Sequence, residues 1–164
     1  MCREALECVE QDAAADPEDI PSKLMTERSM TQTPPVSKRY SEGMATRRQV
    51  LGDDHVDRAE SAKIDFDAPF QELIVEAAWS HVWSRDQWTR RERSMVTIAL
   101  LAALGHYDEV AMHVRATANT GATREDIREA MLHVAVYAGV PAANHAIKIV
   151  KKTFDEMDAE EAGS

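Results

Sequence analysis

The sequence predicts an all-α protein of about six or seven helices in a single domain. Apolar residues recur at helical spacing, and no stretch shows the alternation of apolar and polar residues that is typical of a half-buried strand. Capping residues stand before several of these stretches, and Gly or Pro follows them. A chain of 164 residues is long enough for one domain with its own core, and too short for two ordinary domains.

The net charge of −10 is located at the two ends of the chain. Residues 1–29 carry eight acids and three bases, and residues 153–164 carry five acids and no base. The middle, residues 30–152, contains sixteen acids and sixteen bases and is therefore neutral. Because a neutral body has no basic field to attract phosphate backbones, we expect no binding to nucleic acid.

We divide the chain into an acidic N-terminal extension (1–37), a helical domain (38–155) and an acidic C-terminal tail (156–164). The extension is polar and contains four of the six prolines, so we expect it to be disordered. The tail is expected to be solvated. Met30 is a plausible alternative start, which the intact mass of the natively expressed protein would test.

The sequence favours a cytoplasmic protein without membrane contact. Both cysteines, Cys2 and Cys8, lie in the extension, so neither a disulfide framework nor a thiolate metal site is expected. The N-terminus lacks the basic region and apolar core of a secretory signal. The longest apolar run, 95–104, is far shorter than the roughly 20 residues of a membrane-spanning helix.

Three helices are predicted in the first half of the domain. Ser41 can cap the first, which ends at Gly52, and a short second helix follows a polar turn and runs to about Ala62. Asp67 can cap the third, and Pro69 is tolerated in its first turn. We expect this helix to be well buried because apolar residues and one histidine recur at helical spacing. They are Phe70, Ile74, Ala77, Ala78 and His81, and Leu73, Trp79 and Trp83 widen this apolar stripe.

The fourth helix, 90–104, is predicted to be the central core helix. Thr89 and Glu92 form a capping box before it, and Gly105 is placed to end it. After Met95 the helix is apolar almost all round, which is typical of a buried helix.

Three more helices complete the domain. A fifth helix, 107–119, stops at Gly121. Thr123 and Asp126 give an acidic variant of the capping box, which opens a sixth helix that runs to about residue 138. The last helix begins at Pro141, continues past residue 150 and fades into the acidic end.

The six histidines do not form a recognisable metal motif. No two are four residues apart, so no pair shares a helix face at the spacing of zinc-binding helices, and we predict no metal site. Glu109 precedes His113 by one turn and either orients its ring or forms an ordinary surface pair with it. Glu129, His133 and Tyr137 repeat this step, as a relay or as a polar seam between helices.

Several stretches, which together span roughly residues 38–155, closely resemble the carboxymuconolactone decarboxylase family. The resemblance rests on residues 39–58, 70–71, 79, 90–104, 113–115 and 136–144. It implies the alkylhydroperoxidase-like all-α fold.

The wider superfamily includes thiol reductases with a glutamate followed by Cys-x-x-Cys-x-x-x-His. When this motif is aligned with the chain, its histidine corresponds to His113 and its two cysteines correspond to His106 and Glu109. Its glutamate lies near Ser94. Thiol chemistry needs a thiolate, which neither position can form, so the sequence excludes the peroxidase reaction.

The resemblance implies a carboxy-lyase of the protocatechuate branch of the β-ketoadipate pathway. Its reaction converts 4-carboxymuconolactone to β-ketoadipate enol-lactone. Loss of carbon dioxide pushes electrons through the conjugated double bond into the lactone carbonyl, so that the substrate is its own electron sink and no cofactor is needed. The protein must anchor the carboxylates, stabilise the dienolate oxygen and protonate carbon.

The resemblance makes His113 the candidate general acid or dienolate donor, because this residue matches the active-site histidine of the superfamily. Arg47 and Arg48 are candidates for binding carboxylates, although one of them could instead pair with a nearby aspartate. Further candidates for substrate binding are His55, Tyr137 and Asn144.

The resemblance also implies a homo-oligomer, a hexamer or a trimer, which acts on a small dicarboxylate lactone. Two alternatives stay open. One is an enzyme of the same fold that acts on another lactone or a β-keto acid. The other is a non-catalytic helical oligomerisation module that has kept the scaffold.

Overall fold

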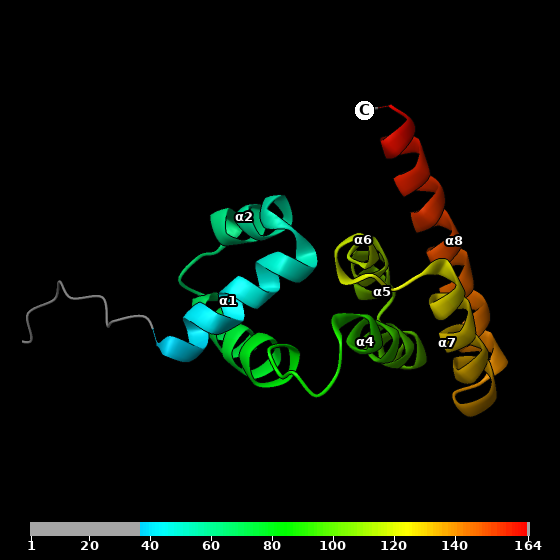
Figure 1. Ribbon diagram of the computed structural model, residues 1–164, viewed down its shortest axis with the longest axis horizontal. Coiled ribbons are helices and arrows are strands. Elements are labelled where there is room, and N and C mark those ends of the chain that lie inside the picture. The colour runs from blue at the N-terminus through cyan, green and yellow to red at the C-terminus, as the bar shows by residue number, and fades with distance from the viewer. Residues whose placement is uncertain (1–36, 164) are drawn as a thin grey trace, which may run out of the picture. The chain divides into compact units, whose positions relative to one another are not determined.

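The computed structural model describes residues 37–163, and this part of the chain is all-α, as predicted. It contains eight α-helices and one π-helical segment, η1, and no strand (Figure 1). The elements, in order, are α1 (Lys38–Leu51), α2 (Asp53–Ala62), α3 (Ala68–Ile74), η1 (Val75–Trp83), α4 (Arg90–Leu104), α5 (Tyr107–Arg115), α6 (Thr117–Thr120), α7 (Arg124–Tyr137) and α8 (Val140–Ala162).

Helix α1 begins four residues earlier than the sequence predicts. Its cap is Ser37, whose hydroxyl oxygen accepts a hydrogen bond of 3.0 Å from the amide of Tyr40. The hydroxyl of Ser41 donates instead to the carbonyl of Ser37. Gly52 ends α1 with φ +85°, which an L side chain rarely adopts, and α2 begins at the next residue.

Both predicted capping boxes are confirmed. In α4 the amide of Glu92 donates to the hydroxyl of Thr89 at 3.2 Å, and the carboxylate of Glu92 accepts from the amide of Thr89 at 2.7 Å. Thr123 and Asp126 make the same pair of bonds at the start of α7. Arg91 of α4 donates two hydrogen bonds of 2.6 Å to Asp126, which keeps the pKa of this carboxyl low and ties the two helices together.

The third predicted helix is only partly as expected. Its second half is the π-helical segment η1, and Asp67 does not cap its start, since this carboxylate accepts from the amide of Ile64. The predicted buried face is only partly correct. Phe70, Leu73, Ala77 and His81 are exposed, whereas Trp79 and Trp83 are buried as predicted. Hydrogen bonds that reach five residues back enlarge each turn and shift the inward face. The buried residues are Val75, Trp79, Ser80 and Trp83.

The predicted fifth helix is two helices in the structure. Helix α5 ends at Arg115 and the short helix α6 begins at Thr117. The hydroxyl of Thr117 donates to the carbonyl of Val114 at 2.7 Å, which satisfies a carbonyl at the break. As a result α5 and α6 can each follow a different part of the core.

Two apolar clusters make up the core. The larger cluster joins α4, α5, α7 and α8 and includes Ile98, Val114 and Met131. The smaller one joins α1 and η1 and includes Trp79 and Trp83, with Ala116 from the α5–α6 junction. Residues 114 and 116 therefore belong to different clusters, and His113 stands beside the boundary between them.

Helix α1 approaches η1 closely at Gly43. A Cβ at this position would overlap the carbonyl oxygen of Val75 and lie 3.0 Å from the amide nitrogen of Ser80. Only glycine fits here without a shift of backbone, and this contact fixes α1 against the segment that carries the two tryptophans.

The acidic C-terminal residues differ from the expected tail, because α8 continues to Ala162, beyond the predicted domain end at residue 155. Arg115 donates to Glu156 and Glu160, and Arg124 donates to Asp158. These ion pairs hold the end of α8 to α5 and to the start of α7. The predicted extension 1–37, apart from its last residue, lies outside the described residues, as does Met30. In residues 37–163 no helix has both the length and the apolar character to cross a membrane.

Candidate active site

The imidazole of His113 lies on a surface formed by two tryptophans. His113 comes from α5 and is 7% exposed. Its ring centroid is 6.4 Å from that of Trp79 and 5.9 Å from that of Trp83, at interplanar angles of 22° and 13°. Both tryptophans come from η1, four residues apart, and also contact each other. The π-helical segment thus builds one wall of an aromatic site for the histidine.

Burial makes His113 a neutral imidazole at pH 7. Its pKa is lowered from 6.5 to about 4, chiefly by burial, while the charge of Glu109 acts to raise it and that of His55 to lower it. Its Nδ1 atom is buried and has no hydrogen-bond partner in the described residues. A buried polar atom without a partner needs an explanation, and an active site that awaits a ligand is one.

Glu109 does not hold the ring of His113. No hydrogen bond joins the two side chains within residues 37–163, and Glu109 is exposed. The glutamate acts on the histidine only through its charge. The interpretation that Glu109 orients the ring of His113 therefore lacks the hydrogen bond that it requires.

Arg47 is buried near the same histidines. Arg47 is 7% exposed. One terminal nitrogen of its guanidinium donates to Glu60 at 3.2 Å, and its Nε has no partner among the described residues. The pKa of His55 is lowered by burial first, and then by the positive charges of Arg47 and Arg58. The charge of His55 in turn lowers the pKa of His113. The structure therefore brings three predicted residues, Arg47, His55 and His113, into one electrostatic neighbourhood.

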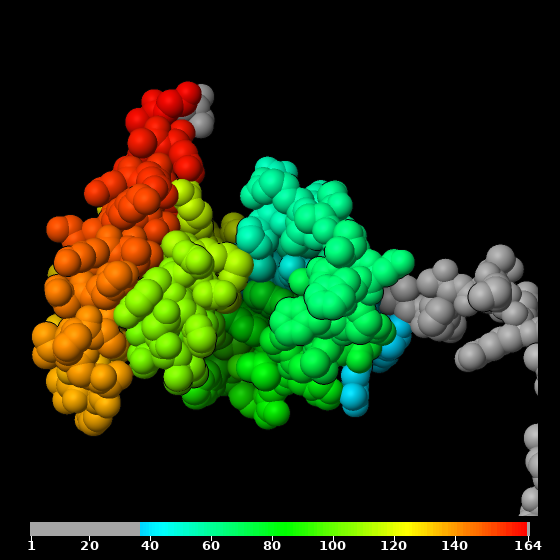
Figure 2. All heavy atoms as spheres, turned by 180° about the vertical axis from the view of Figure 1, so that it is seen from behind, coloured from blue at the N-terminus to red at the C-terminus, as the bar shows by residue number. Residues whose placement is uncertain are grey.

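A groove of about 720 Å³ opens beside His55, between the start of α2 and α5. Its walls include His55 and Arg58 of α2, and Met112 and Arg115 of α5. In Figure 2 a recess separates the blue-green surface of α2 from the yellow-green surface of α5. This volume is in the range of small-molecule sites.

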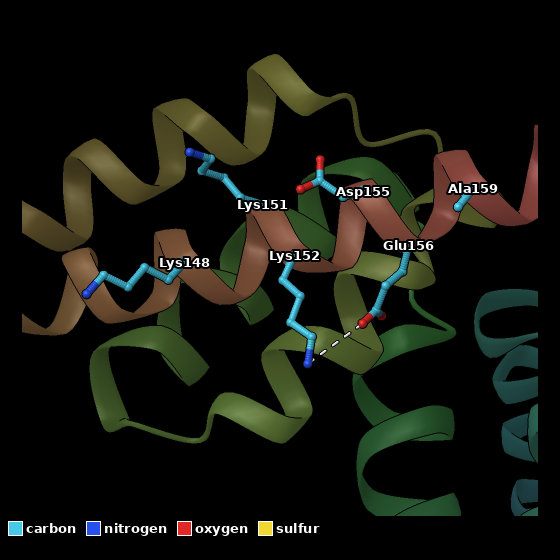
Figure 3. A pocket seen from close by; sticks show the side chains of 6 residues that line it. All are labelled: Lys148, Lys151, Lys152, Asp155, Glu156 and Ala159. Carbon is cyan, nitrogen blue, oxygen red and sulfur yellow. Dashed lines mark ion pairs between the residues drawn. The ribbon is translucent and has the colours of Figure 1, made fainter.

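A second depression, of about 570 Å³, does not have the form of an active site. It lies along α8, and all its labelled side chains come from that one helix, as Figure 3 shows. Lys152 and Glu156 form an ion pair of 3.8 Å there, on an exposed face. Because no second element contributes a residue to its lining, we assign no chemistry to it.

The sequence and its relatives agree on the family. Residues 68–152 match the carboxymuconolactone decarboxylase family. The chain is 43% identical over 120 residues to a 4-carboxymuconolactone decarboxylase from Acinetobacter baylyi, which covers 73% of this chain and 90% of the relative. This chain belongs to the carboxymuconolactone decarboxylase family.

Another relative is named for a different substrate. A nitrosuccinic acid decarboxylase from Metarhizium robertsii is 39% identical over 118 residues, which is 72% of this chain and 82% of the relative. A 4-carboxymuconolactone decarboxylase from Pseudomonas putida is 51% identical over 41 residues, which is 25% of this chain and 85% of that sequence. Two substrate names thus occur among relatives of this family member.

The thiol positions of the superfamily are occupied by other groups in this carboxymuconolactone decarboxylase family member. His106 and Glu109 are exposed at the start of α5. Ser94, near the position of the glutamate in the reductases, is fully buried, and its hydroxyl donates to that of Thr120 at 2.8 Å. This buried pair joins α4 to α6 and takes no part in the electrostatics around His113.

Arg48 is engaged in two ion pairs with aspartates, whereas Arg47 forms one ion pair, with Glu60. It donates to Asp53 at 3.0 Å and to Asp57 at 2.7 Å, and these two hydrogen bonds raise its pKa. The alternative considered for these arginines, pairing with nearby aspartates, therefore applies to Arg48. Its guanidinium joins the end of α1 to α2.

Tyr137 and Asn144 lie apart from His55, His113 and Arg47. Tyr137 is 83% exposed at the end of α7, where its ring stacks on that of His133 at 6.0 Å. Asn144 is exposed in the second turn of α8. Helix α7 packs mainly against α4 and α8, on the far side of α4 and α5 from α1 (Figure 1). No contact in the described residues joins either side chain to His113.

The sequence reasoning missed Arg58, Arg115 and the second tryptophan of the stack. His55 and Arg58 are three residues apart on α2, a spacing that places two side chains on one helix face. That signal could have identified Arg58. The role of Trp83 depends on the π-helical register, which spacing does not reveal. No cluster of three or more His, Cys, Asp or Glu side chains suited to a metal ion occurs in residues 37–163.

Proposed function

We propose that this chain catalyses the cofactor-independent decarboxylation of 4-carboxymuconolactone to β-ketoadipate enol-lactone, in protocatechuate degradation. The 43% identity to the Acinetobacter baylyi decarboxylase over nine-tenths of that protein supports the reaction. The structural observation that carries the proposal is the buried, neutral His113, with an unpartnered nitrogen, beside His55 and Arg47.

The substrate supplies the electron sink and the protein supplies the charges. When the bond from the ring to the γ-carboxylate breaks, its electron pair moves through the double bond into the lactone carbonyl, and carbon dioxide leaves. The resulting dienolate is protonated on carbon, so one proton is taken up for each carbon dioxide released. Anchoring by guanidinium and hydrogen bonding to the dienolate oxygen are the parts left to side chains.

Of the two roles considered for His113, we favour that of dienolate donor. An imidazole with a pKa of about 4 carries no extra proton at pH 7. A neutral imidazole still has one N–H, which can donate to a developing oxyanion, as neutral catalytic histidines do in other enzymes. In this proposal Arg47 binds one substrate carboxylate and His55 contacts the substrate from the groove.

The test is turnover of the purified protein. Incubation with 4-carboxymuconolactone should release carbon dioxide in step with the loss of lactone absorbance. Failure on this lactone would exclude the proposed reaction. Turnover of a nitro-substituted dicarboxylic acid in its place would favour the second candidate, which the Metarhizium robertsii relative supports, an enzyme that decarboxylates another acid with a built-in electron sink.

We further propose that the protein is a homo-oligomer and cytoplasmic. Large apolar side chains are exposed on three helices that pack against one another, α4, α7 and α8. They are Val96, Leu100, Leu104, Leu132, Val136, Val140 and Ile147. Apolar surface of this extent is typical of an interface. The cytoplasmic location rests on the sequence alone.

A further inference from the structure

The proposed substrate carries two carboxylates, so its binding requires arginines that are not already held in ion pairs. Arg47 is buried and forms an ion pair of 3.2 Å with Glu60, although its Nε has no partner in the described residues. Arg48 is engaged by Asp53 and Asp57. Neither of the two arginines chosen from the sequence, Arg47 and Arg48, is therefore free of an ion pair.

Two other arginines line the groove between α2 and α5, and only one of them forms ion pairs. Arg115 donates to Glu156 at 2.5 Å and to Glu160 at 3.0 and 3.1 Å. Arg58 forms no ion pair within residues 37–163. It lines the groove three residues from His55, and its positive charge acts on that histidine.

We propose that the groove is a carboxylate-binding site and that Arg58 is its anchor. A guanidinium can bind a carboxylate through two parallel hydrogen bonds, so Arg58 fixes one end of a dicarboxylate in the groove. This inference rests on the proposed function for the identity of the ligand.

One acidic side chain in the groove opposes such a ligand. Asp54 lines the groove one helical turn before Arg58, yet the two form no ion pair in the described structure. Asp53 forms an ion pair with Arg48, which also pairs with Asp57. The carboxylate of Asp54 therefore repels an anionic ligand, and its removal should act opposite to the removal of Arg58.

Steady-state kinetics of the full-length protein test the anchor. Arg58→Gln should raise KM for the lactone roughly 10- to 100-fold, with kcat within about threefold, because a charge-assisted bond that forms in the ground state and persists in the transition state is lost. The KM of Arg58→Lys should lie between that of the wild type and that of Arg58→Gln. Asp54→Asn should lower KM. Arg39→Gln, an exposed arginine at the far end of α1, is the matched control and should change neither constant.

Direct binding separates the groove from the reaction. A saturated analogue of the lactone lacks the conjugated electron sink and cannot lose carbon dioxide. Its Kd can therefore be measured by calorimetry whether or not the wild-type protein decarboxylates the lactone. Weaker binding by Arg58→Gln and tighter binding by Asp54→Asn would support the site. An unchanged Kd in Arg58→Gln, or no binding by the wild-type protein, would overturn it, whereas wild-type binding without turnover would count against the proposed function alone.

Discussion

At the scale of single residues, the environment of His113 decides its chemistry. The two indoles and the surrounding core remove solvent, and this loss outweighs the favourable charge of Glu109. A histidine on the surface would titrate near neutral pH, but this one stays uncharged across the physiological range. Two predictions follow from its burial, one for catalysis and one for stability.

Replacement of His113 by Ala should lower kcat roughly 100- to 1000-fold, because one donor to the dienolate oxygen is removed. For the wild-type protein, kcat should be independent of pH between about 5.5 and 8 as far as His113 is concerned, and should fall as pH approaches 4. Stopped-time assays of carbon dioxide release check both statements. His81→Ala, an exposed histidine of η1, is the control, and a His113→Ala variant with normal turnover and circular dichroism would contradict the role.

The same pKa makes stability depend on pH. The folded pKa of about 4 is below the unfolded value of 6.5, so the unfolded chain binds more protons between these values. The stabilisation by neutral His113 is complete above pH 6.5 and is lost as pH falls to 4, by up to about 3 kcal/mol. Urea titrations of the wild type and His113→Gln across this range should show a difference in unfolding free energy that shrinks at low pH. A constant difference would refute the buried neutral state.

At the scale of elements, the contact between α1 and η1 places the aromatic wall. Gly43→Ala should destabilise the protein by about 1–3 kcal/mol, because the added methyl meets backbone atoms of Val75 and Ser80 and not a flexible side chain. Thermal unfolding measures the change. The matched control is Gly163→Ala, at the end of α8, where the methyl would meet only ordinary contacts. Equal effects of both substitutions would argue against the tight approach.

Helix ends were predictable to the extent that local chemistry determines them. The boxes at Thr89 and Thr123 need only residues three apart, and both formed as expected. The π-helical segment was not predictable, because apolar spacing over nine residues does not distinguish hydrogen bonds to the fourth residue from bonds to the fifth. The exposure of His81 follows from this shift. The cap at Ser37 was missed since Ser41 offers the same hydroxyl.

The candidate site shows the same division between local and distant information. His113 was identified by resemblance, and Arg47 and His55 by their place in the matching segment. Which of two adjacent arginines is engaged by aspartates depends on how α2 folds back on α1, and that is a tertiary contact. The position of Tyr137 beyond α4 and α5 likewise depends on packing between distant helices.

At the scale of the whole molecule, the exposed apolar residues of α4, α7 and α8 are expected to be covered by other copies of the chain. Leu100→Glu should shift the protein to a smaller species in light scattering, because a charge would have to be buried in the interface. Leu100 is 57% exposed, so the fold of one subunit should be unaffected. Ala159→Glu, on the exposed face of α8, should leave the mass unchanged. A wild-type protein that is monomeric at micromolar concentration would refute the interface.

The stack of His113 on Trp79 and Trp83 also gives the protein an optical probe of its own candidate site. Two of the three tryptophans lie against this imidazole, and the third, Trp88, is 50% exposed and should emit at longer wavelength. Protonated imidazole quenches indole emission more strongly than the neutral form. Blue-edge fluorescence can therefore report the protonation of His113 and the arrival of a ligand in real time, without a label and without turnover.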